Sequence, residues 1–410
     1  MAPMEVSKHL KIRFFIYFSE KFFEGLVIPF FIIYASKELS AALLGAALVA
    51  ITFLSTISGL WGGYIADFLG RRRILLSAEL LKTLTLFLLS LLVFKKYNIS
   101  FALTVYLAVQ IMASILSAVS EAVTLDILKP EQFKQAYSTL YWLNNLGRST
   151  GTILGVILYE GYGFYSLPFL CALFSSISTL LIATQMKETQ SLESYSLIHQ
   201  KGFLNQYKKT LSDKNILIFL LANILHFSIA LQLTYYVAMR LSLEFPQQKL
   251  LTVGGYVLLI NALQIIGVLR LQTNFMVILL NRWTQKIAQP LKLTTIFTIF
   301  PLLAATNFSI IMVSNSAWKL IFCMAIYTFS EMIYLPALHA LLPQFVPEHA
   351  RAKYSSIKSL DLRVAMLVSS MFVFLADFFP PTTLAYMIIA IGVTMVLFLL
   401  KLLKNLNEVI

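Results

Sequence analysis

The feature that most constrains this chain is a succession of apolar runs, each about as long as a bilayer is thick. Hydrocarbon offers the backbone no hydrogen bonds, so a run of about 20 apolar residues in a membrane is expected to be an α-helix. The sequence predicts an all-α membrane protein with twelve transmembrane helices. These helices are expected near residues 11–36, 41–66, 74–94, 99–127, 135–160, 165–186, 214–240, 250–281, 291–313, 317–343, 354–379 and 382–403.

The composition excludes a soluble protein. Hydrophobic residues make up 59% of the chain and charged residues 12%, whereas a soluble domain carries about 25% charged residues. Cys171 and Cys323 lie in separate apolar runs and predict no disulfide framework, and the five histidines lack the close spacing of metal ligands. The first run contains Glu20 and Lys21 and lacks a small-residue cleavage site, so we interpret it as a retained helix.

A polar stretch near residues 187–213 divides the apolar runs into two groups of six. The predicted domains are an N-terminal six-helix bundle over 1–187, a cytoplasmic linker loop over 188–213 and a C-terminal six-helix bundle over 214–410. An even number of spans in turn places both termini on the same side of the membrane.

The basic residues indicate which side that is. With both termini in the cytoplasm, 20 basic residues, Arg13 among them, fall on the cytoplasmic side and 6 on the other, as the positive-inside rule requires. The six are Lys37, Lys95, Lys96, Arg240, Lys249 and Lys319. We expect a multi-pass protein of a bacterial cytoplasmic membrane, with lipids as partners. Lipids of the inner leaflet account for the net charge of +13 without a nucleic-acid partner.

Residues 62–73 form the most distinctive short segment, because three consecutive arginines lie between two apolar runs. Arginines at such a density belong in water, so the segment is expected to be a tight cytoplasmic turn. Gly63 is expected to let two backbones approach closely, and Gly70 to reverse the chain at positive φ. Asp67 is expected to pair with an arginine or a helix N-terminus. The arginines are Arg71, Arg72 and Arg73.

Carboxylates inside the first span are candidates for function, because a charge at the centre of a bilayer costs about 2.5–3.5 kcal/mol on insertion scales. Glu20 and Glu24 are four residues apart and share one helix face. Like charges on a face of low dielectric favour protonation, so at least one of them is a candidate proton carrier. The alternative is that Lys21 or Arg13 neutralises one of them while the other lies in a wet cavity mouth.

Polar residues form a stripe down one face of the 99–127 run and end at a carboxylate, Glu121. Interhelical hydrogen bonding explains the neutral members, while Glu121 is a candidate for substrate or proton binding. Asp126 lies at the cytoplasmic end, where we expect it to gate by pairing with the arginine turn. The stripe consists of Gln110, Ser114, Ser117 and Glu121.

Glycines recur at every fourth position in the 135–160 run, a pattern typical of close helix packing. Asn145 precedes them as a candidate substrate contact, and Arg148 lies among them. Arg148 is expected to form a structural pair with Glu121 or Asp126. The glycines are Gly147, Gly151 and Gly155.

In the second half, Glu331 is the strongest candidate for a binding site. It lies near the middle of its run, with Tyr327 four residues before it and Tyr334 three residues after it. A carboxylate between aromatic rings suits a lipophilic cation through Coulomb and cation–π attraction. The alternative is a salt bridge from Glu331 to Arg270 or Arg363.

Two further charged or titratable positions lie inside predicted helices of the second half. His226 is interpreted either as a hydrogen-bonded packing residue or as a proton relay. Arg270 needs a partner within its span, and Glu331 and Asp361 are the acids that could supply one. Structural ion pairs are thus expected at Arg148, Arg270, Asp361 and Arg363.

The pattern Gly-x3-Asp-x2-Gly-Arg-Arg at 63–72 resembles the signature loop of the major facilitator superfamily. Residues 281–286 keep the basic members of a second copy and lose its Gly and Asp. Two groups of six helices around a central loop match this resemblance. It implies inverted three-helix repeats and a substrate site between the halves near the midplane.

Several stretches also look like the drug:H⁺ antiporters of this superfamily, in order along most of the chain. They are the turn at 62–73, Tyr141-Trp142 with Asn145, Asn281-Arg282 with Thr284, and Glu331-x2-Tyr334-x-Pro336. The resemblance implies conformational coupling for Asp67, gating for Asp126, and substrate or proton binding for Glu331. Acidic residues of that pattern are missing at Leu140, at Thr234 and near Gly392, so the proton path must differ.

The sequence therefore predicts a secondary transporter, not an enzyme, which exports lipophilic, cationic compounds in exchange for protons by alternating access. A small-molecule substrate and protons are the expected partners. No cofactor and no metal are expected, and ATP is not the expected energy source because no nucleotide-binding loop is present. We expect a monomer. The alternatives are a transporter of a peptide, sugar, lysolipid or glycolipid, and a membrane-embedded enzyme or sensor.

Overall fold

The computed structural model describes residues 8–128, 133–186, 213–253, 256–345 and 351–407. The chain forms two compact units. The first comprises Met1–Glu38 and Ala47–Gln200, and the second comprises Leu39–Ala46 and Lys201–Ile410. The boundary differs from the predicted one in a short segment, 39–46, which belongs to the second unit. The predicted linker 188–213 lies almost entirely outside the described residues.

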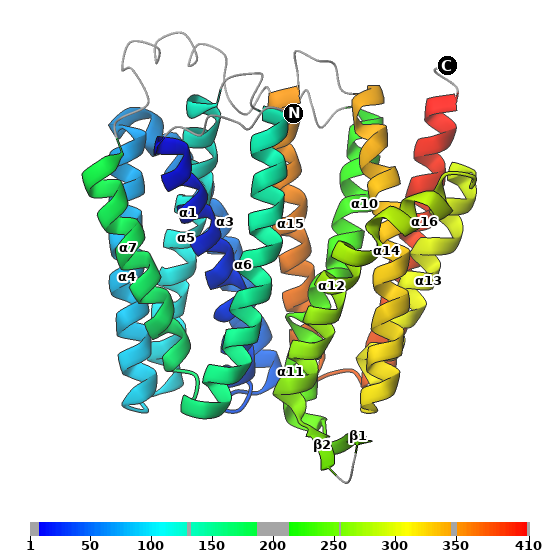
Figure 1. The fold of residues 1–410 in the computed structure, drawn as a ribbon, viewed down its shortest axis with the longest axis horizontal. Coiled ribbons are helices and arrows are strands. Elements are labelled where there is room, and N and C mark those ends of the chain that lie inside the picture. The colour runs from blue at the N-terminus through cyan, green and yellow to red at the C-terminus, as the bar shows by residue number, and fades with distance from the viewer. Residues whose placement is uncertain (1–7, 129–132, 187–212, 254–255, 346–350, 408–410) are drawn as a thin grey trace. The chain divides into compact units, whose positions relative to one another are not determined.

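The first unit is built from long helices that run side by side (Figure 1). Val27 separates two helices within the first predicted span, because Pro29 near the start of the second of them has no backbone N–H to continue the ladder. The helices are α1 (Lys8–Leu26), α2 (Ile28–Ala35), α3 (Ala41–Leu69), α4 (Arg71–Phe94), α5 (Ile99–Ile127), α6 (Phe133–Tyr162) and α7 (Ser166–Gln185).

The second unit repeats this helical plan but adds a β-hairpin. A 3-10 turn, η3, interrupts the predicted 214–240 run, which continues as a short helix. The elements are α10 (Lys214–Ala230), η3 (Leu231–Leu233), α11 (Tyr236–Glu244), β1 (Gln248–Val253), β2 (Tyr256–Ile260), α12 (Ala262–Ala288), α13 (Leu293–Val313), α14 (Ala317–Phe345), α15 (Arg351–Leu375) and α16 (Pro381–Asn407).

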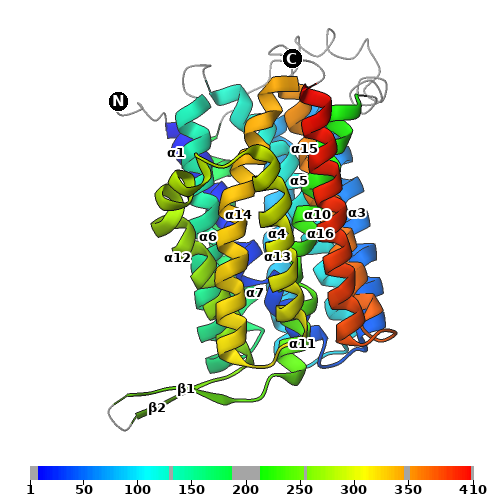
Figure 2. The same cartoon turned by 90° about the vertical axis from the view of Figure 1, so that its right-hand side faces the viewer.

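The hairpin corrects one predicted helix. The sequence predicts a span over 250–281, whereas residues 248–253 and 256–260 pair as antiparallel strands and the helix begins at Ala262 (Figure 2). The segment is rich in β-branched and aromatic residues on both sides of Gly254-Gly255, which is the sequence signature of a hairpin. Apolar character alone therefore did not distinguish strand from helix.

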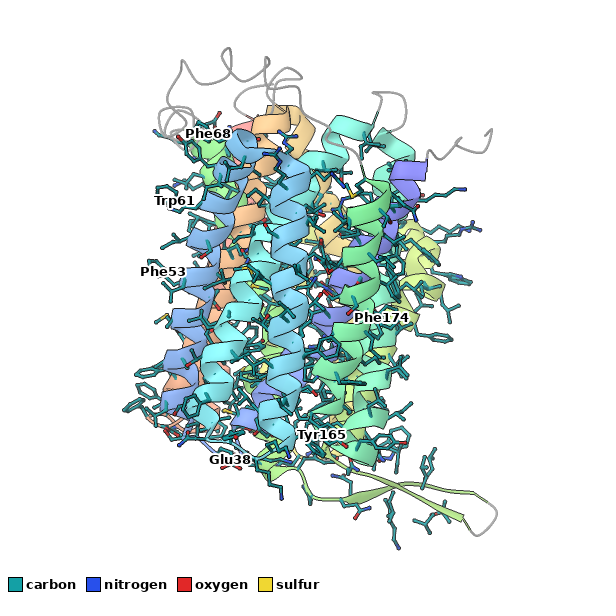
Figure 3. All side chains as sticks on the ribbon, turned by 90° about the vertical axis from the view of Figure 1, so that its left-hand side faces the viewer. Glu38, Phe53, Trp61, Phe68, Tyr165 and Phe174 are labelled. Carbon is teal, nitrogen blue, oxygen red and sulfur yellow. The ribbon has the colours of Figure 1, made fainter. Side chains whose placement is uncertain are left out.

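Nine helices in the described residues are long and apolar enough to cross a membrane. The large apolar side chains of Phe53, Trp61 and Phe68 project outward from α3, where an aqueous protein would carry polar groups (Figure 3). The predicted runs 11–36, 135–160 and 354–379 are helical but are not among the nine. The structure is thus that of a membrane protein.

Two arginines that the sequence assigned to water are buried instead. Arg13 lies within α1, and Arg240 lies within α11 in the 214–244 span. Arg240 donates hydrogen bonds to the carbonyl oxygens of Ile311 (3.2 Å) and Ser314 (2.6 Å), and it pairs with Glu244 at 3.2 Å. Exposed carbonyls at the end of α13 compensate its desolvation, which is why a charge is tolerated there.

Candidate functional site

Glu331 and His226 form the centre of a polar site inside the second unit. His226 projects from α10 and Glu331 from α14, and His226 Nε2 lies 3.3 Å from Glu331 Oε1. The other ring nitrogen, Nδ1, lies 2.7 Å from the hydroxyl of Tyr334. The histidine side chain is 1% exposed and that of Glu331 is 21% exposed. One imidazole therefore joins an accessible carboxylate to a buried phenol.

The two tyrosines expected to flank Glu331 have different surroundings. Tyr334 is buried and contacts His226, as above, while Tyr327 is buried against α13, with its ring 5.0 Å from that of Phe308 at 70°. The aromatic surface beside Glu331 therefore comes with a histidine that the sequence had not placed there. The sequence predicted His226 as a candidate for substrate or proton binding, and the structure adds its contact with Glu331.

The alternative weighed for Glu331, a salt bridge to Arg270 or Arg363, is not present in the described residues. Glu331 contacts His226, and not Arg270 or Arg363. Arg270 instead donates a hydrogen bond to the hydroxyl of Thr234, which follows η3. Asp361 is buried on α15 and accepts a hydrogen bond from the backbone N–H of Leu362 at 2.6 Å. A pairing of Arg270 with Asp361, and a partner for Arg363, stay predictions.

In the first unit, Glu24 is held between two cations. Its carboxylate pairs with Lys21 on the same helix and with Arg148 on α6. The predicted pairing of Arg148 with Glu121 is therefore wrong, and a pairing with Asp126 lies outside the described residues. The alternative weighed for the acid pair, neutralisation by Lys21 or Arg13, describes the geometry of both acids, since Arg13 lies 3.9 Å from Glu20.

Glycines on α6 make this ion pair possible. A Cβ at Gly151 would lie 2.5 Å from the carbonyl oxygen of Phe22, and one at Gly147 would lie 3.0 Å from that of Phe18. Helices α1 and α6 thus approach backbone to backbone, as the four-residue spacing indicates. That approach brings Arg148 within reach of Glu24. Asn145 lies half-buried one turn before Arg148, and its carbonyl oxygen accepts the hydroxyl of Ser149 at 2.6 Å.

A cavity of about 410 Å³ lies in the first unit beside these residues. Charged residues of both signs line it, and of these Arg13 and Glu20 are buried. Arg13 Nε donates to the hydroxyl of Thr124 at 2.6 Å, and Ser120 donates to Glu20 at 3.2 Å. The lining residues are Arg13, Tyr17, Glu20, Lys21, Ser117, Glu121, Thr124 and Leu140.

Glu121 differs from the other acids of this unit. It is exposed to the cavity, and no described residue forms a hydrogen bond or an ion pair with it. The members of the polar stripe on α5 have different surroundings. Ser114 is buried close to Gly59 of α3, while Ser117 and Glu121 line the cavity. Glu121 is thus a carboxylate available to a cation or a proton.

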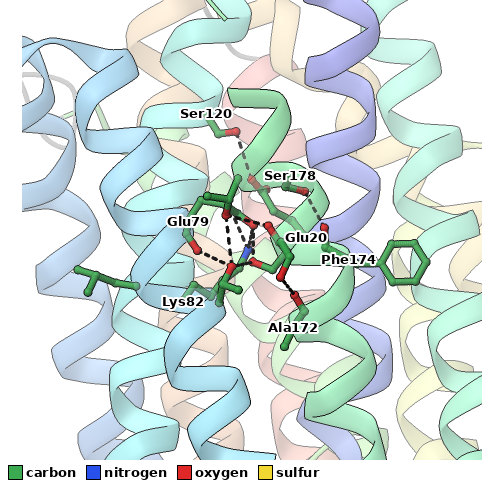
Figure 4. A network of polar contacts seen from close by, with 12 residues as sticks. Glu20, Glu79, Lys82, Ser120, Ala172, Phe174 and Ser178 are labelled. Carbon is green, nitrogen blue, oxygen red and sulfur yellow. Dashed lines mark hydrogen bonds and ion pairs between the residues drawn. The ribbon is translucent and has the colours of Figure 1, made fainter. Parts of the chain in front are cut away.

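One buried ionic group was missed by the sequence reasoning. Glu79 and Lys82 lie one turn apart on α4, with Oε1 and Nζ 2.9 Å apart and side chains 1% and 3% exposed. Ser175 on α7 donates to Glu79 at 2.6 Å, and Thr83 donates to Ser175 at 2.8 Å. In Figure 4 Glu20 lies beside this pair. Two opposite charges inside an apolar run were the available signal, since each is costly alone.

The turn at 62–73 is tighter than expected. Helix α3 continues to Leu69, α4 begins at Arg71, and only Gly70 lies between them, with the predicted positive φ of 95°. Asp67 Oδ1 pairs with Arg71 at 3.1 Å. Arg71 also donates to the carbonyl oxygen of Ala122 on α5 at 3.2 Å, so this turn is fastened to another helix of the same unit.

The expectation for Gly63 needs correction, and the expectation for Asp126 lies outside the described residues. A Cβ at Gly63 would meet only Ala118 at 3.9 Å, an ordinary contact, so Gly63 is not where the backbones approach. The tight position is Gly62, where a Cβ would lie 2.7 Å from Ile115. Arg72 donates to the carbonyl oxygen of Ala183 on α7 at 2.7 Å. The side chain of Asp126 lies outside the described residues.

Comparison with known proteins identifies the relatives of this chain. The family model of the Major Facilitator Superfamily matches residues 13–368. A Na(+), Li(+), K(+)/H(+) antiporter of Planococcus maritimus is 24% identical over 385 residues, which cover 90% of this chain and 89% of that protein. An uncharacterized MFS-type transporter of Escherichia coli (strain K12), YdeE, is 24% identical over 345 residues, which cover 82% and 80%.

Solved structures show the same fold at lower identity. A POT family transporter in complex with 5-aminolevulinic acid matches with a TM-score of 0.74 and 15% identity, covering 97% of this chain and 96% of that one. A D-xylose-proton symporter matches with a TM-score of 0.67 and 14% identity, covering 95% and 96%. The family and the fold are those of membrane transporters, not of enzymes.

Proposed function

Because the chain belongs to the major facilitator superfamily, we propose that it exports lipophilic, cationic small molecules in exchange for protons by alternating access. The proposal includes twelve transmembrane helices with both termini in the cytoplasm of a bacterial cell. It further includes function as a monomer, with substrate, protons and lipids as the binding partners.

The observation that carries the proposal is the Glu331–His226 contact. A carboxylate paired with arginine would be neutralised permanently, whereas histidine carries no permanent charge, so its contact leaves the carboxylate of Glu331 available to a cation. A proton on Glu331 removes that charge and with it the attraction for the cation. Cation and proton therefore compete for one carboxylate, which is the thermodynamic requirement for antiport.

His226 gives this competition a path for the proton. Its Nδ1 contacts Tyr334, and its Nε2 lies close to Glu331 although the two are not aligned as a hydrogen bond, so a small movement of either side chain would let a proton pass between carboxylate and ring. The aromatic rings beside Glu331 favour an organic cation by cation–π attraction. We assign substrate and proton binding to Glu331, His226, Tyr334 and Tyr327.

The first unit supplies a second acid of the same type. Glu121 faces the 410 Å³ cavity without a described partner, whereas Glu20 and Glu24 have cations beside them. We propose that Glu121 and Glu20, which line the cavity, take part in proton binding, and that Glu24 and Asn145 support the site from outside the lining. In this proposal Arg148 fixes Glu24.

The arginine turn is proposed to control the cytoplasmic side. Arg71 on α4 pairs with Asp67 on α3 and is bonded to α5, so moving α4 against α3 breaks the ion pair and moving it against α5 breaks the bond to Ala122. Gly70 allows the turn and Arg72 attaches it to α7. We assign conformational gating to this turn, together with Asp126.

A second candidate substrate is a monovalent metal cation. The observation that favours it is the relative described as a Na(+), Li(+), K(+)/H(+) antiporter, which matches 90% of this chain. The same carboxylate competition would serve a metal ion as well as an organic one. The solved peptide and sugar transporters share only the fold and do not favour their own substrates for this chain.

The test is transport in proteoliposomes with an imposed pH gradient. Ethidium and Hoechst dye report organic cations, and an internal pH dye with external Na⁺, Li⁺ or K⁺ reports metal-ion exchange. We compare the wild type with Glu331→Gln and His226→Gln, and use Glu38→Gln as the control for an exposed acid in the turn after α2.

We expect gradient-driven dye movement in the wild type and the control, and loss in Glu331→Gln. Loss of proton coupling with retained dye exchange is expected in His226→Gln. A rise of the internal pH on addition of Na⁺, Li⁺ or K⁺, without dye movement, would favour the monovalent metal cation as the substrate. Gradient-driven transport that persists in a folded Glu331→Gln variant would refute the assignment of Glu331.

A further inference from the structure

The β1–β2 hairpin carries apolar side chains on both of its faces. Leu251 pairs with Leu258 on one face, and Val257 and Leu259 alternate onto the other. All four are between 43% and 55% exposed. A two-stranded hairpin is at best marginally stable in water, and it gains nothing from apolar groups that remain hydrated. These side chains therefore need an apolar environment outside the described chain.

The hairpin is fastened to the start of α14. Gln248 donates to the carbonyl oxygen of Asn315 at 2.8 Å and accepts the backbone N–H of Ala317 at 3.1 Å. Trp318 Nε1 donates to the carbonyl oxygen of Leu250 at 3.2 Å. The three bonds fix the base of the hairpin against the turn between α13 and α14, and its apolar pairs extend beyond that base (Figure 2).

Trp318 shows which surface the hairpin continues. It is 54% exposed, and Phe322, one turn further along α14, is 66% exposed. On a spanning helix such a row of large apolar side chains faces lipid, and Trp is typical of the boundary between hydrocarbon and headgroups. The indole that donates to Leu250 thus joins the hairpin to the lipid-facing surface of α14.

The backbone limits how deep the hairpin can lie. Each strand of a two-stranded sheet has one edge without a β partner. Open sheet edges do not occur in hydrocarbon, because their polar groups would have no hydrogen-bonding partner there. Headgroups and interfacial water supply those partners, while the leucines reach the acyl chains. The exposed Lys249 is suited to lipid phosphate.

From this geometry we propose that the hairpin is a lipid-binding element that lies in the interfacial layer of the bilayer. The partner is the lipid leaflet beside the start of α14, which is the outer leaflet in the proposed topology. The hairpin then holds the α11–α12 connection at a fixed depth in the membrane. This inference rests on no assumption about the transported substrate.

The test measures nitroxide accessibility in proteoliposomes by electron paramagnetic resonance. Cys171→Ala and Cys323→Ala remove the native thiols, and single cysteines carrying the label replace Leu251, Leu258 or Val257. Oxygen partitions into lipid and a water-soluble nickel chelate does not, so the ratio of the two accessibilities reports depth. The controls are Ile278→Cys on an exposed helix face and Lys95→Cys in the turn after α4.

We expect the ratio at Leu258 and Leu251 to be several-fold above that at Lys95 and to approach, without reaching, that at Ile278. A ratio equal to that at Lys95 would place the hairpin in water and overturn the proposal. Labels shielded from both reagents would show that protein covers the hairpin, which also overturns it. Val257 on the opposite face provides an independent reading if either leucine variant fails to fold.

Discussion

Removing one member of the Glu79–Lys82 pair should destabilise the first unit strongly, while removing both should not. Lys82→Met leaves Glu79 buried with only the hydroxyl of Ser175 as a neutral donor, and Glu79→Gln leaves the ammonium of Lys82 without its carboxylate. Breaking a buried ion pair in this way costs about 3–5 kcal/mol. Replacing both charges costs far less, because the desolvation penalty of each ion disappears together with their attraction.

The expected shift is large enough to measure. A unit of this size loses about 2–4 °C of melting temperature per kcal/mol, so each single variant should melt roughly 6–20 °C below the wild type. The double variant Glu79→Gln/Lys82→Met should melt within about 3 °C of the wild type, because neutral replacement of buried pairs is often free of cost. Gln at position 79 still offers an oxygen to Ser175.

The native cysteines allow the melting transition of each unit to be measured separately. Cys171 is buried in α7 of the first unit and Cys323 in α14 of the second. In detergent, a thiol-reactive fluorophore labels each cysteine only when its surroundings open. We use a Cys323→Ala background to follow the first unit and a Cys171→Ala background to follow the second.

The single variants should shift the Cys171 transition and leave the Cys323 transition in place. The reasoning is refuted if either single variant melts like the wild type. It is also refuted if the double variant falls by the sum of the single shifts, since the two charges would then act independently.

Three further predictions use the same thiol readout. Gly151→Ala should lower the Cys171 transition, because its Cβ would meet the backbone of α1, whereas Gly161→Ala, with open space around it, should not. Gly70→Ala should lower the stability by about 1–3 kcal/mol because of the positive φ at this position, and it should also slow transport. Gly63→Ala, whose Cβ meets only an ordinary contact, should leave both stability and transport unchanged. Arg240→Ala should lower the Cys323 transition alone, because carbonyls of α13 lose their donor; equal shifts of both cysteines would contradict this.

The sequence determined the class of this protein and the course of its helices. Hydropathy is a local property, so runs of apolar residues predicted where the helices lie, and nine helices of the described residues are long and apolar enough to span a membrane. Hydropathy failed to predict the hairpin formed by residues 248–253 and 256–260, because an apolar run that also contains β-branched residues and flanks a Gly-Gly pair is compatible with strands as well as with a helix. The positive φ of Gly70 was also predicted from the sequence, since a tight turn between two helices needs a residue that accepts positive φ.

Which charges meet was decided only by the tertiary structure. Arg148 pairs with Glu24, and His226 contacts Glu331, across 124 and more than 100 residues of chain. Periodicity places a side chain on a face of its own helix but does not fix how that helix is rotated against its neighbours. That rotation follows from packing, as where Gly151 lets α6 touch α1. Glu79 and Lys82 were visible in the sequence as two opposite charges inside an apolar run, but only the fold shows them paired and buried beside Ser175.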